Sequence, residues 1–180
     1  MHNKEYRYST ERLLVCEWRS TSPDDWNQEE LAVVVKNILT PKVTQSLPPA
    51  WQGNYTSERA SSWIEERDDE ATTLLVIEKS TRTAIGFIIL FNSADGRDIR
   101  LGYLLAETAW GKGLASELIG GFVEWCKKNA ISSVTGGVES DNTASKRVLE
   151  KNGFVAKPLT NDKSEQMFVL RINQNHDYRR

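Results

Sequence analysis

The sequence predicts an α/β fold with a mixed, mostly antiparallel sheet of about seven strands and helices on both faces. Two runs rich in apolar and β-branched residues, Thr72–Lys79 and Thr83–Phe91, are joined by a short polar link, which is typical of a β-hairpin. Farther along the chain, strand-like runs alternate with helix-like runs, which is typical of strands that pair in parallel across a helix. A meander followed by strand–helix–strand therefore favours a mixed sheet between two layers of helices.

The N-terminal part of the chain combines one strand with two helices. The run Glu11–Trp18 alternates in polarity and includes bulky side chains, which predicts the first strand. Asp24 and Asp25 are suitable residues for starting a helix, and apolar residues at helical spacing continue it to about Thr40. A second helix is predicted at about Ser57–Asp69. Three prolines predict a loop between these helices: Pro41, Pro48 and Pro49.

The C-terminal half alternates strands with helices and ends in a further pair of strands. The predicted elements are a strand at about Arg97–Leu105, a helix from Leu114, a strand at Ile131–Glu139, a helix capped by Asp141 that ends at Asn152-Gly153, and strands at Phe154–Leu159 and Gln166–Ile172. We expect a single domain over residues 1–180, with an ordered part at about 10–172 and a frayed tail at 173–180.

Composition and charge exclude several classes of function. The formal net charge is −2, so no basic field favours nucleic acid as a partner. The sequence contains no secretory signal and no run of about 18 apolar residues, so we expect no membrane contact. Cys16 and Cys126 lie far apart in apolar contexts, which predicts buried, reduced thiols in a cytoplasmic protein. No metal-ligand spacing occurs among the cysteines and histidines, so no metal site is expected.

The segment at residues 110–115, WGKGLA, lies between a predicted strand and a predicted helix. Glycines let the backbone approach an anion closely, and the first turn of a helix offers unpaired N–H groups at the positive end of its dipole. The segment is neither a P-loop nor a dinucleotide-binding fingerprint. On its own it is compatible both with phosphate binding and with a turn that lets a helix pack tightly on a strand.

A second segment at residues 142–154, NTASKRVLEKNGF, favours the first alternative. Together with the strand residues 101–105, LGYLL, and the glycine segment, it resembles the GNAT superfamily of acetyl-CoA-dependent N-acetyltransferases. Gly113 and Ala115 match the last two positions of the pyrophosphate loop of that family, whereas Trp110 replaces its usual Gln or Arg. The Asn-x-x-Ser spacing and residues 11–14, ERLL, resemble the RimJ/RimL-like branch, which acetylates the N-termini of ribosomal proteins.

The resemblance implies a GNAT fold, in which the sheet splays between the fourth and fifth strands, with acetyl-CoA bound at the splay. Backbone groups of Leu104 and Leu105 would pair with the pantetheine amides, and Asn142 would contact the pantetheine arm. Trp110 would either cover the edge of the cofactor or pack under the loop, and we favour packing. The implied cofactor-binding residues are Leu104, Leu105, Trp110, Gly111, Lys112, Gly113, Leu114, Ala115, Asn142 and Ser145.

The resemblance also implies catalytic candidates. Ser145 falls near the thioester sulfur in this branch and is the candidate acid. Related sequences often place Glu where Arg100 stands here, which leaves Asp98 and Glu139 as candidate bases. Asp98 and Arg100 share one face of the strand, so Asp98 either acts as a base through water or forms a surface ion pair with Arg100, and we favour the ion pair. Arg100 is also suited to binding a carboxylate on the substrate.

The expected activity is transfer of an acetyl group to a primary amine, by direct attack in a ternary complex. The acceptor would be a protein N-terminus, an amino acid or a small amine, bound by a monomer or a homodimer. Trp51 and Tyr55 lie in the proline-rich loop, where they either form a lid over the acceptor or simply hold the loop in place. The alternative function is an inactive acyl-CoA-binding sensor or partner module, which the departures at Arg100 and Trp110 keep open.

Overall fold

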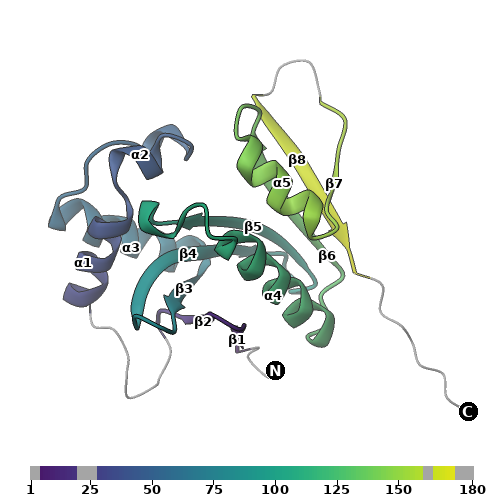
Figure 1. Cartoon of the computed structure of the whole chain (residues 1–180), viewed down its shortest axis with the longest axis horizontal. Helices are drawn as coiled ribbons and strands as arrows, with labels where there is room; N and C mark the ends of the chain where they lie inside the picture. Colours follow the sequence, from purple (N-terminus) through teal and green to yellow (C-terminus); the bar gives the residue numbers. More distant parts are fainter. Residues whose placement is uncertain (1–4, 20–27, 160–163, 173–180) are drawn as a thin grey trace, which may run out of the picture.

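The computed structural model describes residues 5–19, 28–159 and 164–172. These residues build an eight-stranded sheet in the order β1-β2-β3-β4-β5-β6-β8-β7. All neighbouring strands are antiparallel except β5 and β6, which are parallel. Helices cover the sheet on both sides (Figure 1), so the predicted fold class is confirmed.

The bounds of most elements agree with the periodicity of the sequence to within one or two residues. The strands are β1 Arg7–Ser9, β2 Leu13–Glu17, β3 Thr72–Glu78, β4 Thr83–Asn92, β5 Asp98–Leu105, β6 Ser133–Glu139, β7 Val155–Ala156 and β8 Glu165–Arg171. The helices are α1 Gln28–Ile38, α2 Pro41–Thr44, α3 Ser57–Glu70, α4 Leu114–Lys128 and α5 Thr143–Lys151, with 3₁₀ turns at Pro49–Trp51 and Glu107–Ala109.

Four local predictions were wrong. The strand β1 was missed, because three residues are too few to show an alternating pattern. The helix α2 begins at Pro41, where a loop was predicted, because proline is well suited to a first helical position and Thr40 caps the helix. The helix α5 is capped by Asn142 rather than by Asp141, and β7 is shorter than the predicted strand. Asp24, Asp25 and the tail from residue 173 lie outside the described residues.

The two faces of the sheet bury separate cores. One core packs the sheet against α4 and includes Leu114, Leu118 and Phe122, with Leu149 from α5. The other packs the sheet against α1 and α3. Because side chains alternate along a strand, the odd-numbered residues of β5 face α4 and α5, whereas Leu104 belongs to the other core. Within the described ranges, no helix has the length and apolar character that a membrane span requires.

The sheet splays at its centre, between β5 and β6. These strands pair only from Asp98↔Ser133 to Leu101↔Gly136, whereas β5 continues to pair with β4 as far as Leu105. β6 instead pairs with β8 over its whole length and diverges from β5 together with β8 and α5 (Figure 1). The predicted splay between the fourth and fifth expected strands is therefore present, and it leaves the last residues of β5 without a partner on one side.

Candidate active site

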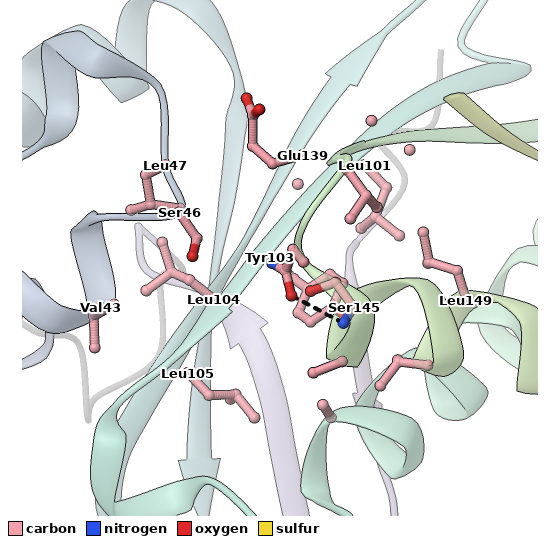
Figure 2. Close-up of a pocket in the computed structure, with 18 of the residues that line it drawn as sticks. Val43, Ser46, Leu47, Leu101, Tyr103, Leu104, Leu105, Glu139, Ser145 and Leu149 are labelled. Atoms are coloured by element: carbon pink, nitrogen blue, oxygen red, sulfur yellow. Dashed lines mark hydrogen bonds between the residues drawn. The ribbon is translucent and has the colours of Figure 1, made fainter. Parts of the chain in front are cut away.

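A cavity of about 950 Å³ occupies the splay and extends from α2 to α5. Figure 2 shows Val43, Ser46 and Leu47 on one side of the opening and Ser145 and Leu149 on the other. The sequence-predicted residues that line it are Leu104, Leu105, Trp110, Gly111, Gly113, Leu114, Ala115, Glu139, Asn142 and Ser145. Lys112 and Asp98 do not line this cavity. The structure thus brings together most of a site whose members are spread over 42 positions of the sequence, from 104 to 145, counting both ends.

The backbone of β5 offers hydrogen-bonding groups to the cavity. The carbonyl of Asp98 accepts a hydrogen bond from Ser93 of the β4 end, and the N–H of Ala106 donates to Ile85. Because hydrogen-bonding direction alternates along an antiparallel strand, the even-numbered residues bond to β4 and the odd-numbered ones face the splay. The backbone groups that face the splay thus belong to Tyr103 and Leu105, which corrects the expectation that Leu104 also provides them.

Trp110 does not pack under the loop, so that expectation was wrong. Its side chain is 44% exposed and lines the cavity. The indole N–H donates to the carbonyl oxygen of Leu105 at 2.9 Å, and the ammonium of Lys42 lies 5.5 Å from the ring centroid. Trp110 therefore satisfies one of the backbone carbonyls that face the splay, and this hydrogen bond joins the glycine segment to the end of β5.

The glycine segment has the geometry of an anion site. Gly111 and Gly113 adopt φ values of +72° and +74°, a conformation that favours glycine. Gly113 is the N-cap residue of α4 and provides no side-chain cap, so the first-turn N–H groups are left to bind a ligand at the positive end of the helix. A Cβ atom at Gly111 would meet nothing within 4 Å, so the loop is open on that side. These features fit a pyrophosphate.

Arg12 and Glu117 fix this loop, and sequence reasoning missed their contact. Glu117 lies in the first turn of α4 and accepts hydrogen bonds from the Thr10 hydroxyl at 2.6 Å and from the Arg12 N–H at 2.8 Å. The Arg12 guanidinium pairs with the same carboxylate at 2.7 Å and donates to the carbonyl of Lys112 at 2.9 Å. The turn before β2 therefore holds both the loop and the start of α4 in place.

We expect the Glu117→Gln variant to lose about 2 kcal/mol of unfolding free energy at pH 7, because hydrogen bonds to a charged group are lost. Partial burial raises the pKa of Glu117, but the hydrogen bonds from Thr10 and Arg12 and the positive charge of Arg12 lower it more, so its net pKa lies below the ordinary value. A lowered folded-state pKa stabilises the fold above the unfolded-state pKa, and that stability is lost as pH falls through the folded-state pKa.

Urea unfolding measures this contribution across a range of roughly pH 3 to 7, which spans the ordinary pKa of a glutamate. The difference between wild type and Glu117→Gln should shrink as the solution becomes acidic. Glu124→Gln, on the exposed side of the same helix, is the control and should change little. A difference that stays constant down to acidic pH would contradict the assigned role of the Glu117 carboxylate.

The start of α5 presents Asn142 and Ser145 to the cavity. The side-chain oxygen of Asn142 accepts a hydrogen bond from the Ser145 N–H at 3.2 Å, drawn as a dashed line in Figure 2. Asn142 is thus a helix cap as well as a lining residue, and capping orients Ser145. Tyr103 from β5 also lines the cavity, and sequence reasoning assigned it no role although it lies in the LGYLL run.

The structure separates the candidate carboxylates. Asp98 begins β5 at the end remote from the splay and accepts a hydrogen bond from the Ser133 hydroxyl at 2.6 Å. Arg100 pairs with Glu165 of β8 at 3.5 Å, so the favoured Asp98–Arg100 ion pair was wrong. Glu139 and Glu165 stand directly opposite each other on β6 and β8, and both line the cavity with Arg100.

Trp51 and Tyr55 hold the loop in place. The Tyr55 hydroxyl donates to the carbonyl of Trp51 at 2.8 Å, and the Tyr55 side chain is buried outside the cavity lining. The Trp51 ring packs edge-on against Trp63 at 5.6 Å and lies 4.4 Å from the Arg67 guanidinium. Trp51 lines the cavity from this fixed position, so only one member of the suggested lid reaches the site.

A sheet splayed at its centre, a glycine loop at the start of a helix and a hydroxyl beside the gap together define a coenzyme A-dependent acyltransferase. The chain belongs to the GNAT family: the family model described as "Acetyltransferase (GNAT) domain" matches residues 24–155. It is therefore an acetyltransferase that uses acetyl-CoA. A comparison with curated protein sequences finds no significant match.

Solved structures share this fold at low sequence identity. A GNAT-family acetyltransferase from Bacillus anthracis is 17% identical with a TM-score of 0.73, over 92% of this chain and 98% of that one. The ribosomal L7/L12 α-N-protein acetyltransferase RimL, solved with coenzyme A, is 16% identical with a TM-score of 0.72, over 92% and 97%. A Salmonella typhimurium enzyme that modifies the N-terminal serine of L7/L12 is 16% identical with a TM-score of 0.68, over 91% and 97%.

Proposed function

We propose that this protein transfers the acetyl group of acetyl-CoA to a primary amine, with a protein N-terminus as the leading acceptor. The observation that carries the proposal is the continuous cavity between the glycine loop, Ser145 and Glu139. Such a cavity holds a donor and an acceptor together, as direct attack in a ternary complex requires. The likeness to RimL, an α-N-protein acetyltransferase of ribosomal L7/L12, supports the protein N-terminus among the possible amines.

Each polar group in the donor half of the cavity has a role in binding or activating acetyl-CoA. First-turn N–H groups of α4 and the loop around Gly113 bind the pyrophosphate. The backbone groups of Tyr103 pair with the pantetheine amides, and the Leu105 N–H polarises the thioester carbonyl. Acetyl-CoA supplies the acetyl group, and its carbon–sulfur bond breaks as the carbon–nitrogen bond forms. Ser145 donates the proton that the leaving sulfur takes up.

The acceptor half of the cavity carries a carboxylate suited to an amine. Glu139 lines the cavity at the end away from Leu105 (Figure 2), and a carboxylate there attracts an ammonium group and accepts its proton. Glu165 is already paired with Arg100 and is folded against Gly137, so it is less available. An α-amino group has a pKa of about 8, so it needs little help from a base at neutral pH.

An assay with a panel of amines tests the proposal. The panel contains peptides with different free N-termini, the same peptides with blocked N-termini, amino acids and polyamines, and the readouts are thiol release and the mass of the product. We expect release only with amines and a mass gain on the nitrogen. Binding of acetyl-CoA without transfer to any amine would instead favour a sensor or partner module, the alternative that Arg100 and Trp110 raise.

We expect Glu139→Gln to lower kcat/KM for a peptide amine by about 10-fold near pH 7, because the neutral amide neither attracts ammonium nor accepts its proton. The loss should shrink at pH values above the amine pKa of about 8, where the acceptor is already neutral. Glu165→Gln is the matched control on the opposite strand and should have a smaller effect. A pH-independent loss, or a larger one in the control, would contradict the role of Glu139.

A further inference from the structure

Tyr103 occupies the place in β5 where the strand loses its partner. β5 stays in register with β4 as far as Leu105, but its pairing with β6 stops at Leu101. Because it is odd-numbered, Tyr103 lies on the face of β5 that packs against α4 and α5, and it contacts the core there. Figure 2 shows the side chains of Tyr103 and Ser145 close together between Leu105 at one end of the opening and Glu139 at the other.

The Tyr103 hydroxyl is unusual because it is buried without a hydrogen bond to the described part of the chain. Its oxygen is inaccessible to solvent and has no well-aligned hydrogen-bond partner among the described residues. Buried polar groups are nearly always satisfied, because an unpaired one costs about 1–3 kcal/mol. A tyrosine at this position therefore lowers stability relative to phenylalanine, which has the same ring. The cost is explained if the hydroxyl has a task that packing does not require.

The Ser145 side chain is the group with which the Tyr103 hydroxyl interacts. Burial raises the pKa of the Tyr103 phenol, and a hydrogen-bonding interaction with the Ser145 side chain lowers it in part, so the net pKa stays above the ordinary value. The phenol is therefore protonated at neutral pH, and its O–H is able to donate a hydrogen bond. The Ser145 hydroxyl is both donor and acceptor, so it has room for one bond from Tyr103 and one bond to a ligand.

We propose that Tyr103 is a positioning residue for acetyl transfer: once acetyl-CoA is bound, its hydroxyl donates to Ser145 Oγ and aims the serine proton at the thioester sulfur. The inference rests on the proposed function and deepens it. The amine nitrogen bonds to the carbonyl carbon, and the sulfur leaves with the electron pair of the broken bond and takes the serine proton. The proton that the amine loses passes to Glu139 and on to solvent, and Ser145 regains a proton from solvent water. Tyr103 keeps its own proton throughout.

The Tyr103→Phe variant removes only the hydroxyl oxygen and separates the two effects of that group. We expect kcat to fall about 10-fold, which corresponds to one hydrogen bond made in the transition state. The KM and Kd for acetyl-CoA should stay within about 2-fold, because backbone groups and not the phenol bind the donor. The melting temperature of the ligand-free protein should stay the same or rise, because a buried hydroxyl that is unsatisfied in that state is removed.

Tyr8→Phe is the matched control for loss of a buried tyrosine hydroxyl. Tyr8 donates to the carbonyl of Leu118 at 2.8 Å and does not line the cavity. This variant should lower the melting temperature and leave kcat unchanged, the opposite of the result expected for Tyr103→Phe. The contrast distinguishes a hydroxyl that stabilises the fold from one that serves the reaction.

A double-mutant cycle with Ser145→Ala completes the test. If Tyr103 acts through Ser145, Tyr103→Phe should lower kcat in the wild type and have no further effect in Ser145→Ala. An unchanged kcat in Tyr103→Phe, or losses that multiply in the double variant, would overturn the inference while leaving the proposed function in place. Absence of transfer by the wild-type chain to every amine, although acetyl-CoA binds, would overturn both.

Discussion

Gly113→Asp should raise the dissociation constant for coenzyme A at least about 100-fold, a loss of about 2.7 kcal/mol. Gly113 has a φ of +74°, a conformation in which Asp and Asn are among the better-tolerated side chains. A Cβ atom there meets only a guanidinium nitrogen of Arg12, at 3.7 Å, so the free protein has room for it. The new carboxylate would lie among the N–H groups that bind the pyrophosphate, where it repels the ligand and competes for the same donors.

Gly113→Asn separates charge from shape. Asparagine has nearly the same size and backbone preference as aspartate but carries no charge. Gly113→Asn should therefore weaken binding of coenzyme A by only about 10-fold. Calorimetric titration with coenzyme A measures both constants, and thermal unfolding without ligand verifies that each variant folds. Equal losses in the two variants would show that steric hindrance, not the charge beside the helix start, controls binding at this loop.

Gly86→Ala should lower the unfolding free energy by about 3 kcal/mol, the upper end of the usual cost of overpacking. A Cβ atom on Gly86 would lie 2.4 Å from the carbonyl oxygen of Leu104 and 2.6 Å from a methyl carbon of Leu105. The first contact is with backbone, so relief requires β4 and β5 to move apart. Since Leu105 faces the splay, the variant should weaken binding of coenzyme A as well.

Gly102→Ala is the control on the neighbouring strand. A Cβ atom there would meet Ile89 at 3.9 Å or farther, which is ordinary van der Waals contact. Its unfolding free energy should change by less than about 1 kcal/mol, because adding a Cβ to a strand glycine without a clash is tolerated. Urea denaturation compares the two variants directly. If both variants lost the same unfolding free energy, the cause would be a general intolerance of alanine in these strands and not the clash proposed at Gly86.

The parts of the fold that the sequence predicts are those controlled by local periodicity. The stripe of α4 and the alternation in β3 and β4 place these elements within a residue or two of their bounds. β1 is too short to show a period, and its pairing with β2 depends on tertiary contact. α2 begins with a proline, a residue that marks loops as often as it marks helix starts.

The predicted part of the site is likewise local. The glycines of the phosphate loop and the Asn142–Ser145 spacing are short motifs, and the structure places both at the cavity. The Arg12–Glu117 contact joins positions 105 residues apart, which no local pattern specifies. The direction of the β5 hydrogen bonds, which favours Tyr103 over Leu104, depends on which neighbour β5 pairs with. Arg100 was singled out from the sequence, but its partner Glu165 lies on a strand that only the fold brings near.

A crystal structure with bound coenzyme A tests the central claim most directly, because the claim is one of placement. The pyrophosphate should contact backbone N–H groups of residues 111–116, and the pantetheine should lie along Tyr103 and Leu105 of β5. The sulfur should lie within hydrogen-bonding reach of Ser145 Oγ, with the Tyr103 hydroxyl directed at the same serine. Coenzyme A bound outside the splay, or a sulfur placed away from Ser145, would contradict the account.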